Sequence, residues 1–138
     1  MSGIYEFNSY KPIMLSHQTG LSVTVSTANT FYAIGNAISV PRTGLLAFIA
    51  VSHVSGGNGY IQLGLTRGSN TYYYGSSSSS VLSNASNEIS TTTPSLLFSY
   101  YDRVFFIPVL SNDTLQLYAT NSTAGDITYI DDLWMVLI

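Results

Sequence analysis

Short segments in which apolar and polar residues alternate recur along the chain, and they constrain the fold more than any other feature. Clear examples are residues 21–25, 61–65 and 115–119. A period of two places apolar side chains on one face of a β-strand and small or polar side chains on the other. No segment has a comparably strong 3.6-residue helical period. The pattern therefore predicts a protein built from half-buried strands.

Longer apolar segments and regularly placed turn residues extend this pattern. Residues 44–54 are predicted to form a mostly apolar strand, buried on both sides or paired at an interface. Residues 96–109 are predicted to form two strands that meet near Asp102, and residues 127–138 form the last strand. Turn residues follow one another at intervals of about ten residues, which predicts an all-β sandwich or barrel of about eight to ten antiparallel strands.

Charged residues are scarce, which limits the partners that the chain can bind. They make up 8% of the 138 residues and leave a formal net charge of −3, whereas ordinary soluble domains have about 25% charged residues. Without a basic patch, we expect neither nucleic-acid binding nor attachment to a membrane surface. The apolar stretches are too short to span a bilayer, and the absence of cysteine excludes disulfides and thiolate sites. The four bases stand singly: Lys11, Arg42, Arg67 and Arg103.

The chain is predicted to hold one jelly-roll domain over residues 13–138, preceded by an N-terminal arm or first edge strand over residues 1–12. The first ten residues are polar and aromatic and lack the basic start and apolar core of a signal peptide. Such an arm could pack on a neighbouring subunit or fray. The serine-rich stretch after Gly75 is predicted to be a surface loop.

The jelly-roll assignment comes from a resemblance carried by three segments. Residues 38–51, ISVPRTGLLAFIAV, place a Val-Pro turn and a glycine before a long apolar strand. This segment resembles C1q- and TNF-like jelly rolls and the fibre heads of viruses and phages. Residues 114–119 and 130–138 resemble the penultimate and closing strands of that family. The resemblance implies an antiparallel jelly-roll β-sandwich that forms a homo-oligomer, such as a trimer or pentamer, whose loops bind a partner.

The composition adds a second resemblance. Little charge and much serine, asparagine and tyrosine resemble the surface proteins of viruses that infect thermoacidophilic archaea. With seven carboxylates in the chain, we expect only a small part of the stability to depend on pH. An outward-facing composition without an export segment predicts a virion protein. The alternative is a secreted chain whose signal has been removed.

The sequence gives little support for a catalytic or metal-binding role of the histidines. His17 and His53 are the only histidines, beside Ser16 and Ser52. No Gly-x-Ser-x-Gly motif would expose a nucleophile, and neither histidine has a second histidine or a carboxylate at metal-ligand spacing. We expect structural or surface roles for both histidines and no enzymatic activity.

The acidic residues give no clear site either. Adjacent residues on a strand point to opposite faces, so Asp131 and Asp132 are not expected to share a site. Asp113 and Asp126 lie in asparagine-rich loops and could bind Ca²⁺, although turn formation is the commoner role of such residues. We expect no resident metal and no cofactor.

Tyrosine is unusually frequent, with 11 tyrosines against 6 phenylalanines and 1 tryptophan. Tyrosine is enriched at interfaces because it offers a large contact area and a polar tip. The rings could form a subunit contact or a glycan-stacking surface, or they could line the rim of the core. Trp134 is expected in the core. The candidate interface residues are Tyr72, Tyr73, Tyr74, Tyr100 and Tyr101.

Loops are expected to provide the outward binding surface, over residues 56–59, 67–80 and 121–126. Three Asn-x-Ser/Thr sequons lie in or beside these or other predicted loops and are candidate glycosylation sites: Asn84, Asn112 and Asn121. The candidate outward residues are Gly57, Asn58, Arg67, Asn70, Asn121 and Asp126.

These observations predict a non-enzymatic virion structural or surface protein, located on the virion surface or outside the cell. It would be a capsid decoration, turret or fibre-head protein that acts by homo-oligomeric assembly and host attachment. Its expected partners are other virion proteins and a host-surface glycan. Two alternatives stay open: a carbohydrate-binding module or lectin, and a strand-donating subunit of an extracellular filament.

Overall fold

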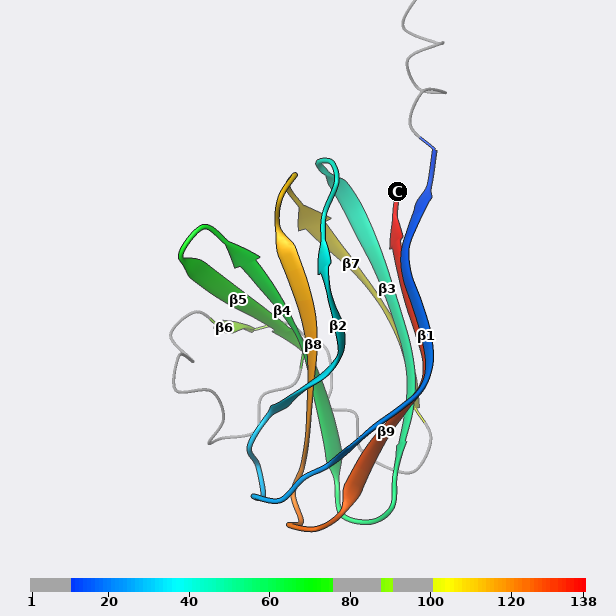
Figure 1. Ribbon diagram of the computed structural model, residues 1–138, viewed down its shortest axis with the longest axis vertical. Helices are drawn as coiled ribbons and strands as arrows, with labels where there is room; N and C mark the ends of the chain where they lie inside the picture. The colour runs from blue at the N-terminus through cyan, green and yellow to red at the C-terminus, as the bar shows by residue number, and fades with distance from the viewer. Residues whose placement is uncertain (1–10, 76–87, 91–100) are drawn as a thin grey trace, which may run out of the picture.

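The protein is a two-layer assembly of strands, seen in a computed structural model that describes residues 11–75, 88–90 and 101–138 (Figure 1). No helix occurs within these ranges. The strands are β1 (Ile13–Thr24), β2 (Tyr32–Ser39), β3 (Gly44–Val54), β4 (Gly59–Arg67), β5 (Asn70–Gly75), β6 (Glu88–Ser90), β7 (Tyr101–Val109), β8 (Thr114–Asn121) and β9 (Ile127–Leu137).

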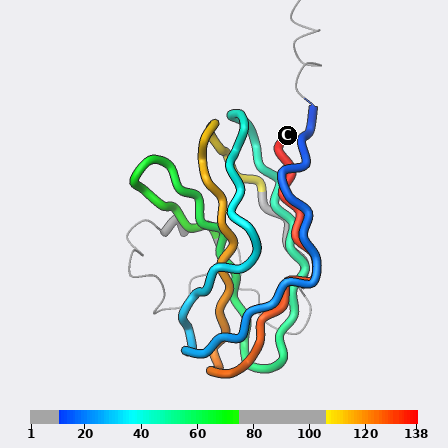
Figure 2. Tube along the Cα trace, in the orientation of Figure 1, coloured from blue at the N-terminus to red at the C-terminus, as the bar shows by residue number. Residues whose placement is uncertain are grey.

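Two sheets face each other. Sheet A has the order β1-β9-β3-β7, and sheet B has the order β2-β8-β4-β5-β6. All neighbouring strands are antiparallel except β6, which pairs parallel to β5 over three residues. Figure 2 shows the first and last strands running side by side, as their register requires. The eight long strands follow the order of a jelly roll, which confirms the predicted all-β sandwich. Kinship with C1q- and TNF-like domains stays a prediction.

The core is the apolar layer between the two inner faces. In β3, for example, Leu46, Phe48 and Ala50 are at most 1% exposed. Each large side chain of this kind contributes about 1.5–3 kcal/mol when it is fully buried. The core cluster draws on strands of both sheets. Its other members are Ile34, Val40, Ile61, Leu63, Leu65, Ile107, Val109, Leu115, Leu117, Ala119, Ile130, Leu133, Met135 and Leu137.

Two strand predictions are refined by the structure. β3 lies between β9 and β7, so it is central in its sheet; its inner side is buried from Leu46 to Ser52, whereas its outer side is half-buried or exposed apart from Ala47. Residues 101–109 form one strand, and the predicted break near Asp102 is wrong. Asp102 and Arg103 lie in continuous register with Val51 and Ala50 of β3, because the unbroken ladder overrides the local charge signal. Residues 96–100 lie outside the described residues.

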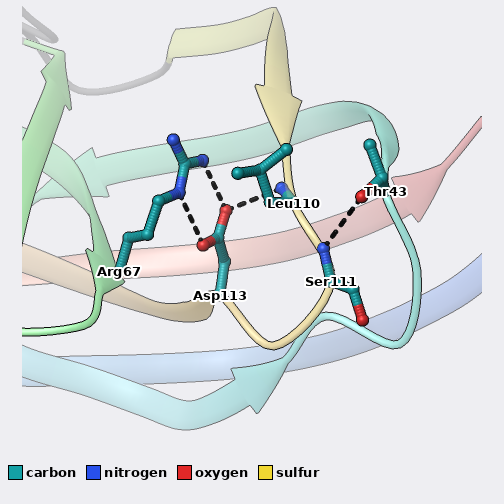
Figure 3. A network of polar contacts seen from close by, with 5 residues as sticks. All are labelled: Thr43, Arg67, Leu110, Ser111 and Asp113. Carbon is teal, nitrogen blue, oxygen red and sulfur yellow. Dashed lines mark hydrogen bonds and ion pairs between the residues drawn. The ribbon is translucent and has the colours of Figure 1, made fainter.

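A buried carboxylate fastens the turns at one end of the sandwich (Figure 3). Arg67 donates from Nε and Nη2 to the two carboxylate oxygens of Asp113, at 2.9 and 2.7 Å. The Leu110 N–H donates to the same carboxylate at 2.7 Å. The Asp113 side chain is 1% exposed, so its charge is compensated by a bidentate partner and a backbone donor. Both carboxylate oxygens therefore accept hydrogen bonds within the fold, as expected of a turn-forming aspartate.

The turn that contains Asp113 is also joined to the turn after β2 by further hydrogen bonds. The Val40 N–H donates to the Asp113 carbonyl at 2.8 Å, and the Asn112 N–H donates back to Val40 at 2.8 Å. The Ser111 N–H donates to the Thr43 hydroxyl at 3.2 Å. The turns after β2, β4 and β7 are thereby held together. The Arg67 guanidinium and the Leu110 N–H lower the pKa of the Asp113 carboxyl, although burial opposes them.

We predict that Asp113→Asn lowers the free energy of unfolding at pH 7 by about 1–3 kcal/mol, because the buried bonds to Arg67 are weakened or lost. A carboxyl whose pKa is lowered in the folded state contributes stability above its unfolded pKa, and this contribution is lost as pH falls. The difference between variant and wild type should therefore shrink from pH 7 to pH 3 in urea unfolding. Asp126→Asn is the control, and a difference that stayed constant with pH would contradict this explanation.

Candidate interaction face

The exposed large apolar side chains of the described residues gather at one end of sheet A. Phe106 is 60% exposed, Met14 50%, Ile138 49% and Leu110 44%. None of the exposed large apolar side chains in the described ranges lies on sheet B. In Figure 1 this is the end at which the C-terminus is marked. We call this surface the apolar end; it comprises Met14, Leu45, Phe106, Pro108, Leu110, Val136 and Ile138.

The strand register makes the apolar end continuous. Met14 lies opposite Val136, Val136 opposite Ala47, and Ala47 opposite Phe106, which forms one row across all four strands. In the next row Leu45 exchanges two backbone hydrogen bonds with Ile138 and lies opposite Pro108. Side chains that are opposite one another on neighbouring strands touch. The apolar end is therefore one patch.

Two histidines of the same face are each held by an aspartate and an aromatic ring. His17 Nε2 lies 2.8 Å from Asp132 Oδ1, and its ring stacks on Trp134 with centroids 3.6 Å apart. His53 Nδ1 lies 2.7 Å from Asp131 Oδ2. Its ring stacks on Tyr129 with centroids 4.2 Å apart. We call this surface the polar half; it comprises His17, His53, Tyr129, Asp131, Asp132 and Trp134.

A β-bulge brings the two aspartates to one face. Val51 pairs with Asp132 but Ser52 pairs with Ile130, so Asp131 is an extra residue of β9 relative to β3. On the other side, the unbroken register places Gly20 of β1 opposite Asp131, and Gly20 has a φ of +64° that favours glycine. The expectation that the two carboxylates point to opposite faces is wrong, because the bulge shifts the alternation by one residue.

The placement of Trp134 was also predicted wrongly. Its neighbours Leu133 and Met135 are buried at 1% and 0% exposure, whereas Trp134 lies on the outer side, half-buried against His17. Sequence distance hid this cluster, since the His17–Asp132 pair is separated by 115 residues and the His53–Asp131 pair by 78. The strand-like segments around His17 and His53 gave no indication of the aspartates that these histidines contact.

The polar half lacks the arrangements of common catalytic and metal sites. Ser16 and Ser52, which precede the histidines, are buried on the inner side at 9% and 4% exposure and so point away from them. Among the described residues, no three histidine or acidic side chains are grouped so as to hold a metal ion. The stacked pairs instead fasten β1 and β3 to β9 across the sheet.

The tyrosines predicted at an interface lie elsewhere. Tyr72 and Tyr74 pack partly buried against the core. Tyr73 is 6% exposed and meets Tyr118 edge to face at 6.1 Å. Burial raises the pKa of the Tyr73 and Tyr74 hydroxyls. Tyr100 and the side chain of Tyr101 lie outside the described residues, so the interface role of this group stays a prediction.

The predicted outward loop residues are mostly exposed. Gly57, Asn58, Arg67 and Asn70 are exposed, and Asp126 is half-buried. The Asp126 carboxylate accepts a hydrogen bond from the Ser55 hydroxyl at 3.1 Å. Their binding role stays a prediction.

Asn121 is not on the outward surface where it was expected. Its side chain is 0% exposed, because its amide donates to the Gly56 carbonyl at 2.8 Å and its Oδ1 accepts from the Thr123 N–H at 2.9 Å. Asn112 of the second sequon is exposed. Asn84 of the first lies outside the described residues. Use of the sequons stays a prediction.

No protein-family model and no curated protein sequence matches the chain. Within the described ranges, no helix has the length and apolar character needed to cross a membrane.

Several solved structures are similar in fold at low identity. The C-terminal domain of A223, a structural protein from Sulfolobus turreted icosahedral virus, is 13% identical with a TM-score of 0.46, over 93% of this chain and 99% of that chain. TmCBM61, solved with β-1,4-galactotriose, is 15% identical with a TM-score of 0.41, over 78% of this chain and 65% of that one. The carbohydrate-binding module CBM6cm-2 from Cellvibrio mixtus lichenase 5A, solved with cellotriose, is 9% identical with a TM-score of 0.40, over 93% of this chain and 96% of that one. Likenesses this low transfer no role to this chain.

We predict a weak, specific coupling between His17 and Asp132. A double-mutant cycle with His17→Ala and Asp132→Ala should give about 0.3–1 kcal/mol in urea unfolding, because an exposed pair is screened by water. The cycle of His17→Ala with Asp131→Ala is the control and should give a coupling near zero, since Asp131 bonds His53. Equal couplings in the two cycles would contradict the observed pairing.

Proposed function

We propose that this protein is a non-enzymatic structural or surface protein of a virion that works by homo-oligomeric assembly. The observation that carries the proposal is the apolar end, where exposed apolar side chains from three strands and the C-terminus form one patch. Soluble monomers rarely expose large contiguous apolar patches, and such patches mark protein–protein contacts. Burying one further large side chain would contribute about 1.5–3 kcal/mol.

Charged groups lie at the border of the apolar end and not among its exposed side chains. The Arg42 guanidinium lies beside Gly44 and Ile138 and donates to the Lys11 carbonyl at 2.9 Å. A partner that packs on the apolar side chains would leave this guanidinium at the rim, where it can keep its water. The whole outer face of sheet A measures about 19 by 40 Å from the spacing of four strands and their length. The apolar end occupies about half of that face, or about 350–400 Å², so it would form the apolar centre of an interface in which each partner buries about 800 Å².

The virion assignment draws on composition. A surface with 8% charged residues that is rich in serine, asparagine and tyrosine suits a protein exposed on a particle. Attachment to the host would fall to the loops at Gly57, Asn58 and Asn70, which are exposed at the ends of the strands. Other virion proteins are the expected neighbours of the apolar end.

A carbohydrate-binding role is the second candidate, and the polar half favours it. Asp131 and Asp132 could accept hydrogen bonds from sugar hydroxyls beside Trp134 and Tyr129. One face of each aromatic ring is already stacked on a histidine, so hydrogen bonding would have to contribute much of the affinity. A glycan array without a bound sugar would rule this role out.

We predict that Leu45→Ser weakens assembly. Losing an apolar contact of about 1.4 kcal/mol or more raises the concentration at which the oligomer dissociates by about tenfold or more. The measurement is solution mass by light scattering over a dilution series. Val51→Ser is the matched control, because Val51 lies on the outer side of the same strand opposite Asp132 in the polar half. A monomeric wild type, or equal effects of the two variants, would count against the apolar end.

The virion assignment has its own test. An antibody against this chain should label intact particles purified from the cells that produce the protein. Detection of the protein in those cells but not in their particles would exclude a virion role. The assembly measurement would be unaffected by that outcome.

A further inference from the structure

We infer that two copies of this chain join edge to edge through β7, which extends sheet A across a two-fold axis. The inference rests on the proposed assembly function and adds to it a second contact, at the β7 edge, that is distinct from packing on the apolar end. Within the described residues, β7 is paired on one side only, with β3. Its pairing runs from Tyr101 to Val109 without a register shift, so the side of β7 that no described strand covers is a regular backbone edge that a further strand can pair with.

The backbone groups on that free side can be identified. Leu45 directs both its N–H and its carbonyl to Ile138 of β9. The backbone N–H and carbonyl groups of successive residues in a strand point to alternate neighbouring strands. Those of Leu46 therefore point to β7 and bond Ile107, the residue opposite Leu46. The residues of β7 on either side of Ile107 therefore face away from β3. The same alternation places the N–H groups of Asp102, Val104 and Phe106 on the open edge.

Pro108 fits this assignment. A proline interrupts a ladder unless its missing N–H faces the free side of an edge strand. Pro108 lies opposite Leu45, whose own groups point to β9, so the proline costs no bond within sheet A. Because Pro108 has no N–H, Phe106 provides the last backbone donor on the open edge of β7.

The other edges of the two sheets are less suited to pairing. β1 shifts register between Met14 and Ser16 and carries Gly20 with a φ of +64°. β2 shifts register between Ile34 and Ile38. β6 is three residues long and pairs only with residues 73–75 of β5, so residues 70–72 of β5 form another edge that is equally short. Irregular or short edges discourage strand addition, which leaves β7 as the regular edge among the described strands.

A second copy is the occupant that this edge fits best. An antiparallel contact between identical edges is self-complementary and closes with two-fold symmetry. With Val104 on the axis, its N–H and carbonyl bond those of Val104 of the second copy, and Phe106 pairs with Asp102 of the second copy. Phe106, which is 60% exposed, then gains a strand beside it. Its exposure at the edge is the second observation that points to a partner.

The absence of cysteine from the chain allows a direct test. Opposed residues of a hydrogen-bonded antiparallel pair lie about 5.5 Å apart at Cα, within the range that a disulfide spans. Val104→Cys in the full chain should therefore form a disulfide-linked dimer under mild oxidation. Thr19→Cys, on the β1 edge of the same sheet, is the matched control and should stay uncrosslinked.

A proline scan tests the ladder itself. Val104→Pro removes an N–H that faces away from β3, so it should halve the solution mass and leave the circular dichroism spectrum unchanged. Thr19→Pro is the control at the other edge. Thr19 lies opposite Asp132 and next to Gln18, which lies opposite Leu133. By the same alternation, the backbone groups of Gln18 point to β9 and the N–H of Thr19 points away from β9. The solution mass of the Thr19→Pro variant should equal that of the wild type.

The outcomes separate this inference from the proposed function. An oligomeric wild type whose Val104→Cys variant does not cross-link would overturn the β7 contact and leave assembly standing. A wild type that is monomeric at every concentration would overturn both. Conversion to monomers on deleting residues 1–10 would also overturn the two-fold contact, because the edge would then be filled by a donated segment.

Discussion

The apolar layer between the two sheets decides which side of every strand faces outward, and the rest of the structure depends on it. Once Leu46, Phe48 and Ala50 are buried, Leu45 and Ala47 have to lie on the outer side of β3. The same rule applies on the neighbouring strands, so four outer stripes merge into one face. Because several of the outward positions are also apolar, the arrangement that buries the core residues exposes an apolar surface on the outer face.

The bulge in β9 resets this alternation between the two faces. Without the extra residue, one of Asp131 and Asp132 would point into the core, where an unpaired carboxylate is costly. The bulge turns both outward, and each aspartate then reaches a histidine on a different neighbouring strand. Asp113 shows the contrasting solution, because it stays buried and is compensated by Arg67 and a backbone donor.

Local patterns predicted the fold well and the polar clusters poorly. Alternation and turn spacing indicated the sandwich, because both are properties of short segments. The continuity of β7 through Asp102 was missed, since it depends on pairing with β3. Trp134 was misplaced because its burial depends on strand parity near a bulge. Asn121 looked like a loop residue, but its side chain is held by Gly56 from another turn. Contacts between segments distant in sequence cannot be read from a single segment.

The irregular β1 edge limits how far copies of the protein can add to one another edge to edge. A contact across β7 uses the regular edge of both copies, so the ends of the extended sheet would be two β1 strands, each with a register shift near Leu15 and a positive φ at Gly20. Irregularities of this kind resist the open-ended stacking that produces fibrils. A protein with little surface charge to keep its copies apart would thereby be protected from runaway polymerisation by its backbone geometry.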